Sequence, residues 1–117
     1  MAAPNIVNVA TIVGKTAVQA VGTSATAIVT NSGSSNKVFK VNALYVSNID
    51  GTVSADITVD LFRSSTAYAI ASTVLVPADS TLDLMSKPLY LEEGDALRCT
   101  ASASGDLVAV CSYEEIS

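Results

Sequence analysis

The first residues that could do chemistry are Gly14-Lys15-Thr16, which match the end of a phosphate-binding loop. The complete motif also requires an earlier glycine, at the position that Val9 occupies here. Its phosphate would need the N-terminus of a following helix, and no long helix is expected after Thr16. The sequence therefore predicts a strand-ending turn at these residues, with no nucleotide site.

Two acidic turns are the candidate cation sites. Asn48-Ile49-Asp50-Gly51 resembles the start of a calcium-binding loop, but Ile57 stands where such a loop needs its glutamate. Glu92-Glu93-Gly94-Asp95 gathers three carboxylates, whose mutual repulsion a hard cation would relieve. A plain turn is the favoured interpretation in each case. We therefore predict neither a metal site nor a cofactor.

Catalytic constellations are not expected either. The chain has no His, which is the side chain that most often transfers protons at neutral pH. Serines are plentiful, but no Gly-x-Ser-x-Gly elbow is present to activate one of them. Asp56 and Asp60 lie four residues apart on the polar face of an expected strand, which favours solvation over a glycosidase pair. We predict that the protein is not an enzyme and has no catalytic residues.

Charge and hydropathy exclude two classes of partner. The 117 residues carry a net charge of -5, and only 15% of them are charged. An acidic domain offers no electrostatic footprint for a nucleic-acid backbone, so nucleic acid is not expected as a partner. No apolar run is long enough to span a bilayer, and the N-terminus lacks the basic region of a secretory signal, so no membrane partner is expected.

Apolar and polar residues alternate along most of the chain, which is typical of strands buried on one face. Val53, Ile57 and Val59 alternate with polar residues such as Thr58, for example. The expected strands are residues 5–13, 26–31, 37–48, 53–62, 68–76, 80–85, 89–91, 96–103 and 107–114. Short strands separated by turns predict an all-β, antiparallel two-sheet β-sandwich, jelly-roll-like, with about eight short strands and an N-terminal arm.

The last two strands carry the two cysteines. If Ser104-Gly105-Asp106 closes a three-residue hairpin, Cys99 lies opposite Cys111, and a disulfide becomes geometrically conceivable. The favoured interpretation is nevertheless a pair of small buried thiols. Whether the two residues are bonded stays open at the level of sequence.

The N-terminal segment is apolar on both faces of its expected strand. We divide the chain into an N-terminal arm or edge strand, residues 1–13, and a β-sandwich domain, residues 14–117. A strand that is apolar on both sides requires cover on both sides, so a neighbouring subunit is expected to contact the arm. The candidate interface residues are Ile6, Val7, Val9, Ile12 and Val13.

A family resemblance rests on the order of segments along the whole chain and not on one motif. The apolar arm is followed by Val/Thr/Ala/Ser-rich strands, then by Val76-Pro77-Ala78, Leu82-Asp83-Leu84 and the stretch from Leu89 to Leu97. This pattern resembles the small β-sandwich virion proteins of tailed bacteriophages, particularly cyanophages, over residues 4–116.

The resemblance implies a non-enzymatic virion protein, assembled in the host cytoplasm, that stabilises the head as a decoration (cement) protein. Its implied partners are further copies of itself, with a trimer as one candidate, and the major capsid protein or other virion proteins. A tail, neck or baseplate component is the alternative. A second alternative, from a different functional class, is a carbohydrate- or receptor-binding sandwich. It would need its tyrosines to gather on one exposed face, namely Tyr45, Tyr68, Tyr90 and Tyr113.

Overall fold

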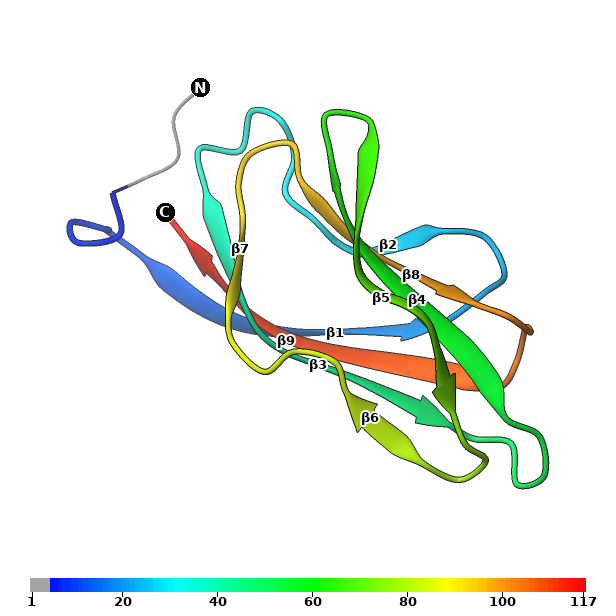
Figure 1. Cartoon of the computed structure of the whole chain (residues 1–117). Helices are drawn as coiled ribbons and strands as arrows, with labels where there is room; N and C mark the ends of the chain where they lie inside the picture. The colour runs from blue at the N-terminus through cyan, green and yellow to red at the C-terminus, as the bar shows by residue number, and fades with distance from the viewer. Residues whose placement is uncertain (1–4) are drawn as a thin grey trace.

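Residues 5–117, which the computed structural model describes, form nine β-strands and no helix (Figure 1). Every strand pairing among them is antiparallel. Because residues 5–117 form no helix, they contain no helix that could cross a membrane. The strands are β1 (Ile12–Ala20), β2 (Thr26–Thr30), β3 (Val38–Asn48), β4 (Ala55–Arg63), β5 (Thr66–Val76), β6 (Thr81–Asp83), β7 (Leu89–Leu91), β8 (Ala96–Ala101) and β9 (Leu107–Ile116).

The strands form two sheets. Sheet A has the order β1-β9-β3-β6, with β7 also paired to β3, and sheet B has the order β2-β8-β4-β5. The pairs are nested along the chain, because β1 pairs with β9, β2 with β8, β3 with β6 and β7, and β4 with β5. This nesting is the jelly-roll connectivity. The predicted all-β, two-sheet sandwich is confirmed.

Alternation of side chains explains the core between the sheets. In β4, Ile57 and Val59 are fully buried, whereas Asp56 and Thr58, which alternate with them, are partly exposed. The same alternation holds in β9, where Ala109 and Cys111 face inward. The largest fully buried apolar side chains are Leu44, Ile57, Leu91, Leu97 and Leu107.

The predicted hairpin between the last two strands is wrong. Ser104-Gly105-Asp106 carries the chain from β8 in sheet B to β9 in sheet A, with Gly105 at a φ of 86°. Cys99 therefore lies beside Val59 of β4, and Cys111 lies beside Leu44 of β3. The same glycine-containing turn fits a hairpin or a crossing between sheets, so the turn alone could not decide.

The two cysteines are free and buried, as the favoured interpretation predicted. Burial raises the pKa of the Cys99 thiol to about 12 and that of the Cys111 thiol to about 11. For Cys99 the neighbouring Cys111 and Asp60 add to this effect. Both side chains therefore stay protonated and unreactive at neutral pH.

The first strand also differs from the prediction. β1 begins at Ile12 rather than at residue 5, and it runs through Gly14 and Lys15, which were expected to end a strand. Its nine residues pair with β9 in unbroken register, and this pairing overrides the turn tendency of glycine. The expected boundary after residue 13 consequently falls inside β1. Residues 5–11 precede the strand, with a turn in which the Asn8 amide donates to the Asn5 carbonyl at 3.0 Å.

Candidate interaction surface

The five predicted interface residues lie in the segment before β1 and at its start. Ile6, Val7, Ile12 and Val13 are exposed, Val7 to 83%, and Val9 is half-buried. The segment is fixed to the end of β9, because the amides of Ala10 and Thr11 both donate to the Ser117 carbonyl. What contacts these side chains in an assembly stays a prediction.

A second apolar feature lies on the outer face of sheet A, where three strands present neighbouring side chains. Val18 of β1 is opposite Val110 of β9, which is opposite Tyr45 of β3. Their neighbours Ala17, Cys111 and Leu44 point into the core, so these three point outward. Val18 is 75% exposed, Tyr45 43% and Val110 37%. We call these three residues the outer row.

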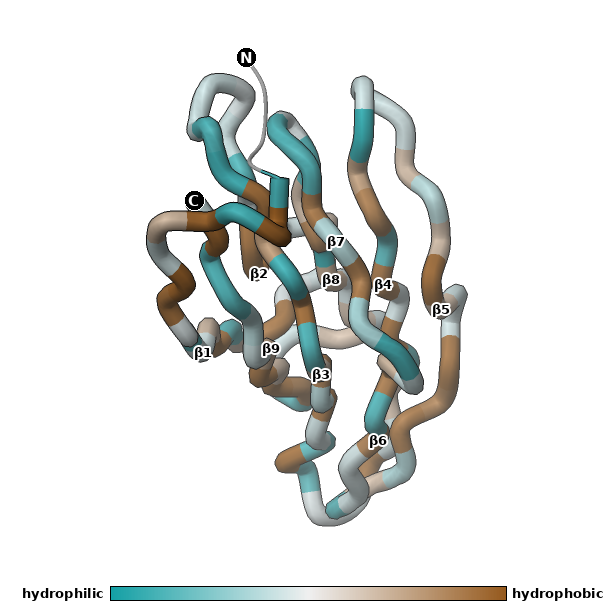
Figure 2. Tube along the Cα trace, turned by 90° about the vertical axis from the view of Figure 1, so that its left-hand side faces the viewer, coloured by the Kyte–Doolittle hydropathy of each residue, from teal (hydrophilic) through white to brown (hydrophobic). Residues whose placement is uncertain are grey.

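A shallow apolar hollow of about 360 Å³ adjoins the outer row, lined by Val18, Gln19, Ala20, Val108, Ala109 and Val110. Figure 2 shows β1 at one margin of the molecule and β5 at the other. Sequence analysis missed the outer row, because only the pairing of β1 with β9 and of β9 with β3 brings the three residues together.

The N-terminal segment is bonded to one end of sheet A. Ile116 and Val38 are paired across β9 and β3, are only 4% and 7% exposed, and do not belong to the core between the sheets. Residues 5–11 pass this point through their bonds to Ser117, and Figure 1 shows them next to the C-terminus. Ile116 and Val38 are therefore buried at the end of sheet A to which this segment is bonded.

The outer face of sheet B carries an ion pair between β4 and β8. Arg98 donates from Nε to Oδ1 of Asp60 at 2.8 Å and from Nη2 to Oδ2 at 3.2 Å. Its guanidinium also lies 4.0 Å from the centre of the Phe62 ring. Asp60 is only 6% exposed, so its expected solvation is wrong, and Arg98 is the partner that sequence reasoning missed.

The Gly14-Lys15-Thr16 run lies in β1 and serves an ion pair. Lys15 Nζ donates to Glu115 at 2.7 Å, and Lys37 Nζ donates to the other oxygen of the same carboxylate at 3.0 Å. The hydrogen bond from Lys15, together with Lys37, lowers the pKa of Glu115 despite its partial burial. Because these residues lie inside β1, the turn expected here is wrong, and Lys15 is already paired with a carboxylate.

The two acidic turns use their carboxylates internally. Asp50 accepts hydrogen bonds from the amides of Thr52 at 2.8 Å and Val53 at 3.1 Å, which lower its pKa. Asp95 accepts a bond from Nε of Arg63 at 2.8 Å and another from the Glu92 amide at 2.8 Å. Among residues 5–117 no cluster of three or more potential metal-ligating side chains is present.

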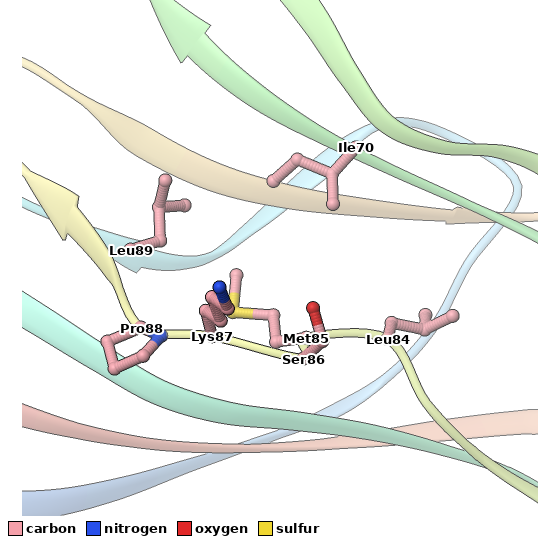
Figure 3. A pocket seen from close by; sticks show the side chains of 7 residues that line it. All are labelled: Ile70, Leu84, Met85, Ser86, Lys87, Pro88 and Leu89. Carbon is pink, nitrogen blue, oxygen red and sulfur yellow. The ribbon is translucent and has the colours of Figure 1, made fainter.

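A small apolar pocket opens on the opposite side of the sandwich from β1. Ile70 of β5 faces the segment from Leu84 to Leu89, across a space of about 190 Å³ (Figure 3). Strand β5 has eleven residues, whereas β6 and β7 have three each, so the inner face of β5 is left without full cover. Apart from Ser86 and Lys87, the residues that line the pocket are apolar. The pocket therefore suits an apolar contact better than a polar ligand.

The four tyrosines do not gather on one face. Tyr113 is partly buried, with its ring centroid 5.6 Å from that of Phe39. Tyr45 and Tyr90 lie in sheet A beside Asp83 and Lys40 respectively, and Tyr68 lies in β5 of sheet B. No aromatic platform for a sugar ring is assembled among the described residues.

Comparison with known proteins defines the class of fold and no family. No protein-family model matches the chain, and no curated protein matches it either. Among solved structures, a chain from Bacillus endospore appendages, described as a novel family of disulfide-linked pili, superposes with a TM-score of 0.54. The match covers 92% of this chain and 88% of that chain, at 15% sequence identity. The likeness at this identity supports the two-sheet β fold alone.

Proposed function

We propose that the protein is a non-enzymatic structural subunit of a repetitive assembly, and specifically a decoration (cement) protein on the head of a tailed-phage virion. It would bind copies of itself and the major capsid protein through the outer face of sheet A and the N-terminal segment. The observation that carries the proposal is the exposed outer row, Val18, Val110 and Tyr45, beside a segment whose apolar residues are also exposed. In sheet B, Asp60 and Arg98 are paired on the outer face, and the exposed apolar side chains, Tyr68, Ile70, Val74 and Leu75, lie on the edge strand β5.

The use of the charged groups supports a structural role. The most buried carboxylates, Asp60 and Asp95, are each held by an arginine, and Glu115 is held by two lysines. Groups committed to such pairs stabilise loops and strands and are not free to transfer protons. The cysteines, the strongest nucleophiles by type, are buried with raised pKa values.

A second candidate is a subunit of an extracellular filament, and the fold likeness to an endospore pilus chain favours it. That family is described as disulfide-linked. Both cysteines of the present chain are fully buried within the sandwich, so a filament built from it would be held by non-covalent contacts. The virion proposal rests on the resemblance of the sequence, and the filament proposal rests on the fold.

Reconstruction of the purified chain, and of particles that carry it, tests both candidates. Density at symmetric positions on the head supports decoration, density at the tail or neck supports the alternative virion role, and a polymer of the chain alone supports the filament. Substitution tests which sheet mediates the association. Val110→Lys places a charge in the outer row of sheet A and is expected to prevent association. Thr100→Lys places the same charge on the outer face of sheet B, and this matched control is expected to leave association intact. A chain that stays monomeric at all concentrations and binds no particle would overturn the proposal.

A further inference from the structure

Strand β1 has a free edge whose hydrogen-bonding groups can be assigned. Thr11 and Ser117 exchange two backbone hydrogen bonds, of 3.0 and 2.9 Å, and are therefore a closely bonded antiparallel pair. Such pairs recur at every second residue, and the bond of 2.9 Å from the Val21 amide to the Leu107 carbonyl fits the same series. The odd-numbered residues of β1 thus bond to β9. The amides and carbonyls that point to the free edge are those of Ile12, Gly14, Thr16, Val18 and Ala20.

The same five residues also present their side chains on the outer face of sheet A. Their sizes are self-complementary about Thr16. An antiparallel second copy with its Thr16 opposite this one would place Ile12 opposite Ala20, and Gly14 opposite Val18. A side chain at Gly14 would meet no atom within 4 Å, so open space exists for the exposed Val18 of a second copy.

We propose that β1 pairs with β1 of a second copy, antiparallel and two-fold symmetric about Thr16, so that the two copies of sheet A form one continuous sheet. The proposal rests on the proposed function and deepens it by naming the contact between copies. The pairing would satisfy the free backbone groups of Ile12, Gly14, Thr16, Val18 and Ala20, and it is isologous, as two-fold contacts must be.

Charge permits this pairing. Lys15 is the one charged residue of β1, and it would lie opposite Ala17 of the second copy. The two Lys15 side chains would be diagonal neighbours across the edge, and the ammonium group of each is held 2.7 Å from Glu115 of its own copy. A shift of the register by two residues would instead place Ile12 opposite Val18, or Gly14 opposite Ala20. Among these registers, only the one about Thr16 places the small Ala20 opposite Ile12 and Gly14 opposite Val18.

The other edges are less suited to pairing. Strand β5 is long, but its pairing with β4 shifts register twice, and Thr73 within it has a φ of 48°. Bulges of this kind twist an edge away from regular partners. Strand β2 also shifts register, between Ala27 and Val29, and β6 and β7 have three residues each. Among the described strands, β1 is therefore the one edge that is both long and regular.

Oxidative cross-linking of Thr16→Cys tests the register. Bonded antiparallel pairs have their Cα atoms about 5.5 Å apart, a separation that a disulfide can bridge. We expect Thr16→Cys to give a disulfide dimer, and Ala67→Cys on the β5 edge and Ser34→Cys in an exposed loop to give little. The native thiols are buried and stay out of the reaction. Equal dimer yield from the three variants would overturn the proposal.

Proline substitution tests the edge without adding a thiol. Thr16→Pro removes an amide that points away from β9, so the fold is expected to survive while self-association weakens about tenfold or more. Ala17→Pro removes an amide bonded to β9 and is expected to destabilise the monomer itself. If the native chain associates but Thr16→Pro associates equally well, the β1 contact is wrong and the structural proposal stands. If the native chain never associates, both fail.

Discussion

Asp60 and Arg98 form a two-bond ion pair across β4 and β8, and the carboxylate is only 6% exposed. Removing one partner leaves the other partly buried and unpaired, which costs more than the pair contributes. We expect Asp60→Ala to lower the free energy of unfolding by about 2–3 kcal/mol. Urea denaturation measures the change, and Asp56→Ala, at a half-exposed position of the same strand face, is the control. An equal effect of the two substitutions would contradict the role of the pair.

The strands could be predicted because their signal is local. Alternation of Ile57 and Val59 with polar neighbours needs no knowledge of the partner strand, and β4 lies where it was expected. The pairing is non-local, and the sequence between Cys99 and Cys111 fits either a hairpin or a crossing. The crossing is favoured here because β9 completes sheet A between β1 and β3.

The candidate surface was only half predictable for the same reason. The apolar character of Ile12 and Val13 is visible in the chain, and both are exposed. The outer row joins residues of β1, β9 and β3 that are far apart in sequence, so that it exists only once the register is known. Alternation along β1 indicates that Val18 faces outward, but only if a strand is predicted there. Gly14 instead led to the prediction of a turn, so that Val18 was not assigned to a strand.

Alkaline pH is expected to destabilise the fold through the two thiols. The folded pKa values of about 12 for Cys99 and about 11 for Cys111 lie above the value of 9.0 for an accessible thiol. Above pH 9 the unfolded chain therefore releases protons that the folded chain keeps, and stability falls as pH rises. The slope is about 1.4 kcal/mol per pH unit for each thiol, until the folded pKa is reached.

Urea midpoints between pH 7 and 11 measure this loss. Cys111→Ala removes one of the two thiols, so the thiol contribution to the fall of stability with pH above pH 9 is expected to decrease by about half. The substitution also leaves a small cavity, which lowers the free energy of unfolding at every pH. An unchanged slope in Cys111→Ala would show that the thiols are not the cause.

Acid is expected to act through Asp95. Burial alone would raise the pKa of this carboxyl, but the hydrogen bonds from Arg63 and the Glu92 amide outweigh it, and its pKa lies below the ordinary value of 3.8. The contribution of Asp95 is therefore present above pH 4 and is lost as pH falls through the lowered folded pKa. Asp95→Asn should be less stable at pH 7, and the difference from the native chain should shrink toward pH 2. Unfolding by urea at several pH values measures this, and a constant difference would contradict it.

Removal of the N-terminal segment is expected to have two separable effects. A chain that begins at Ala10 lacks Ile6, Val7 and Val9, and we expect it to expose Ile116 and Val38 on the outer face of sheet A. Loss of this cover should lower the free energy of unfolding by about 1–2 kcal/mol, because each partly covered aliphatic side chain contributes about that order. The larger effect is expected in assembly, since three of the candidate interface residues are gone.

Light scattering and particle binding separate the two effects of this truncation. A double substitution, Ile6→Ser with Val7→Ser, keeps the backbone of the segment and its bonds to Ser117, and it removes only exposed apolar groups. We expect it to retain most of the stability of the native chain and to lose association, because Ile6 is 49% and Val7 83% exposed in the monomer and both can contact a neighbour. Normal attachment of both the truncated and the doubly substituted chains would show that the segment serves only as a cover for its own sheet.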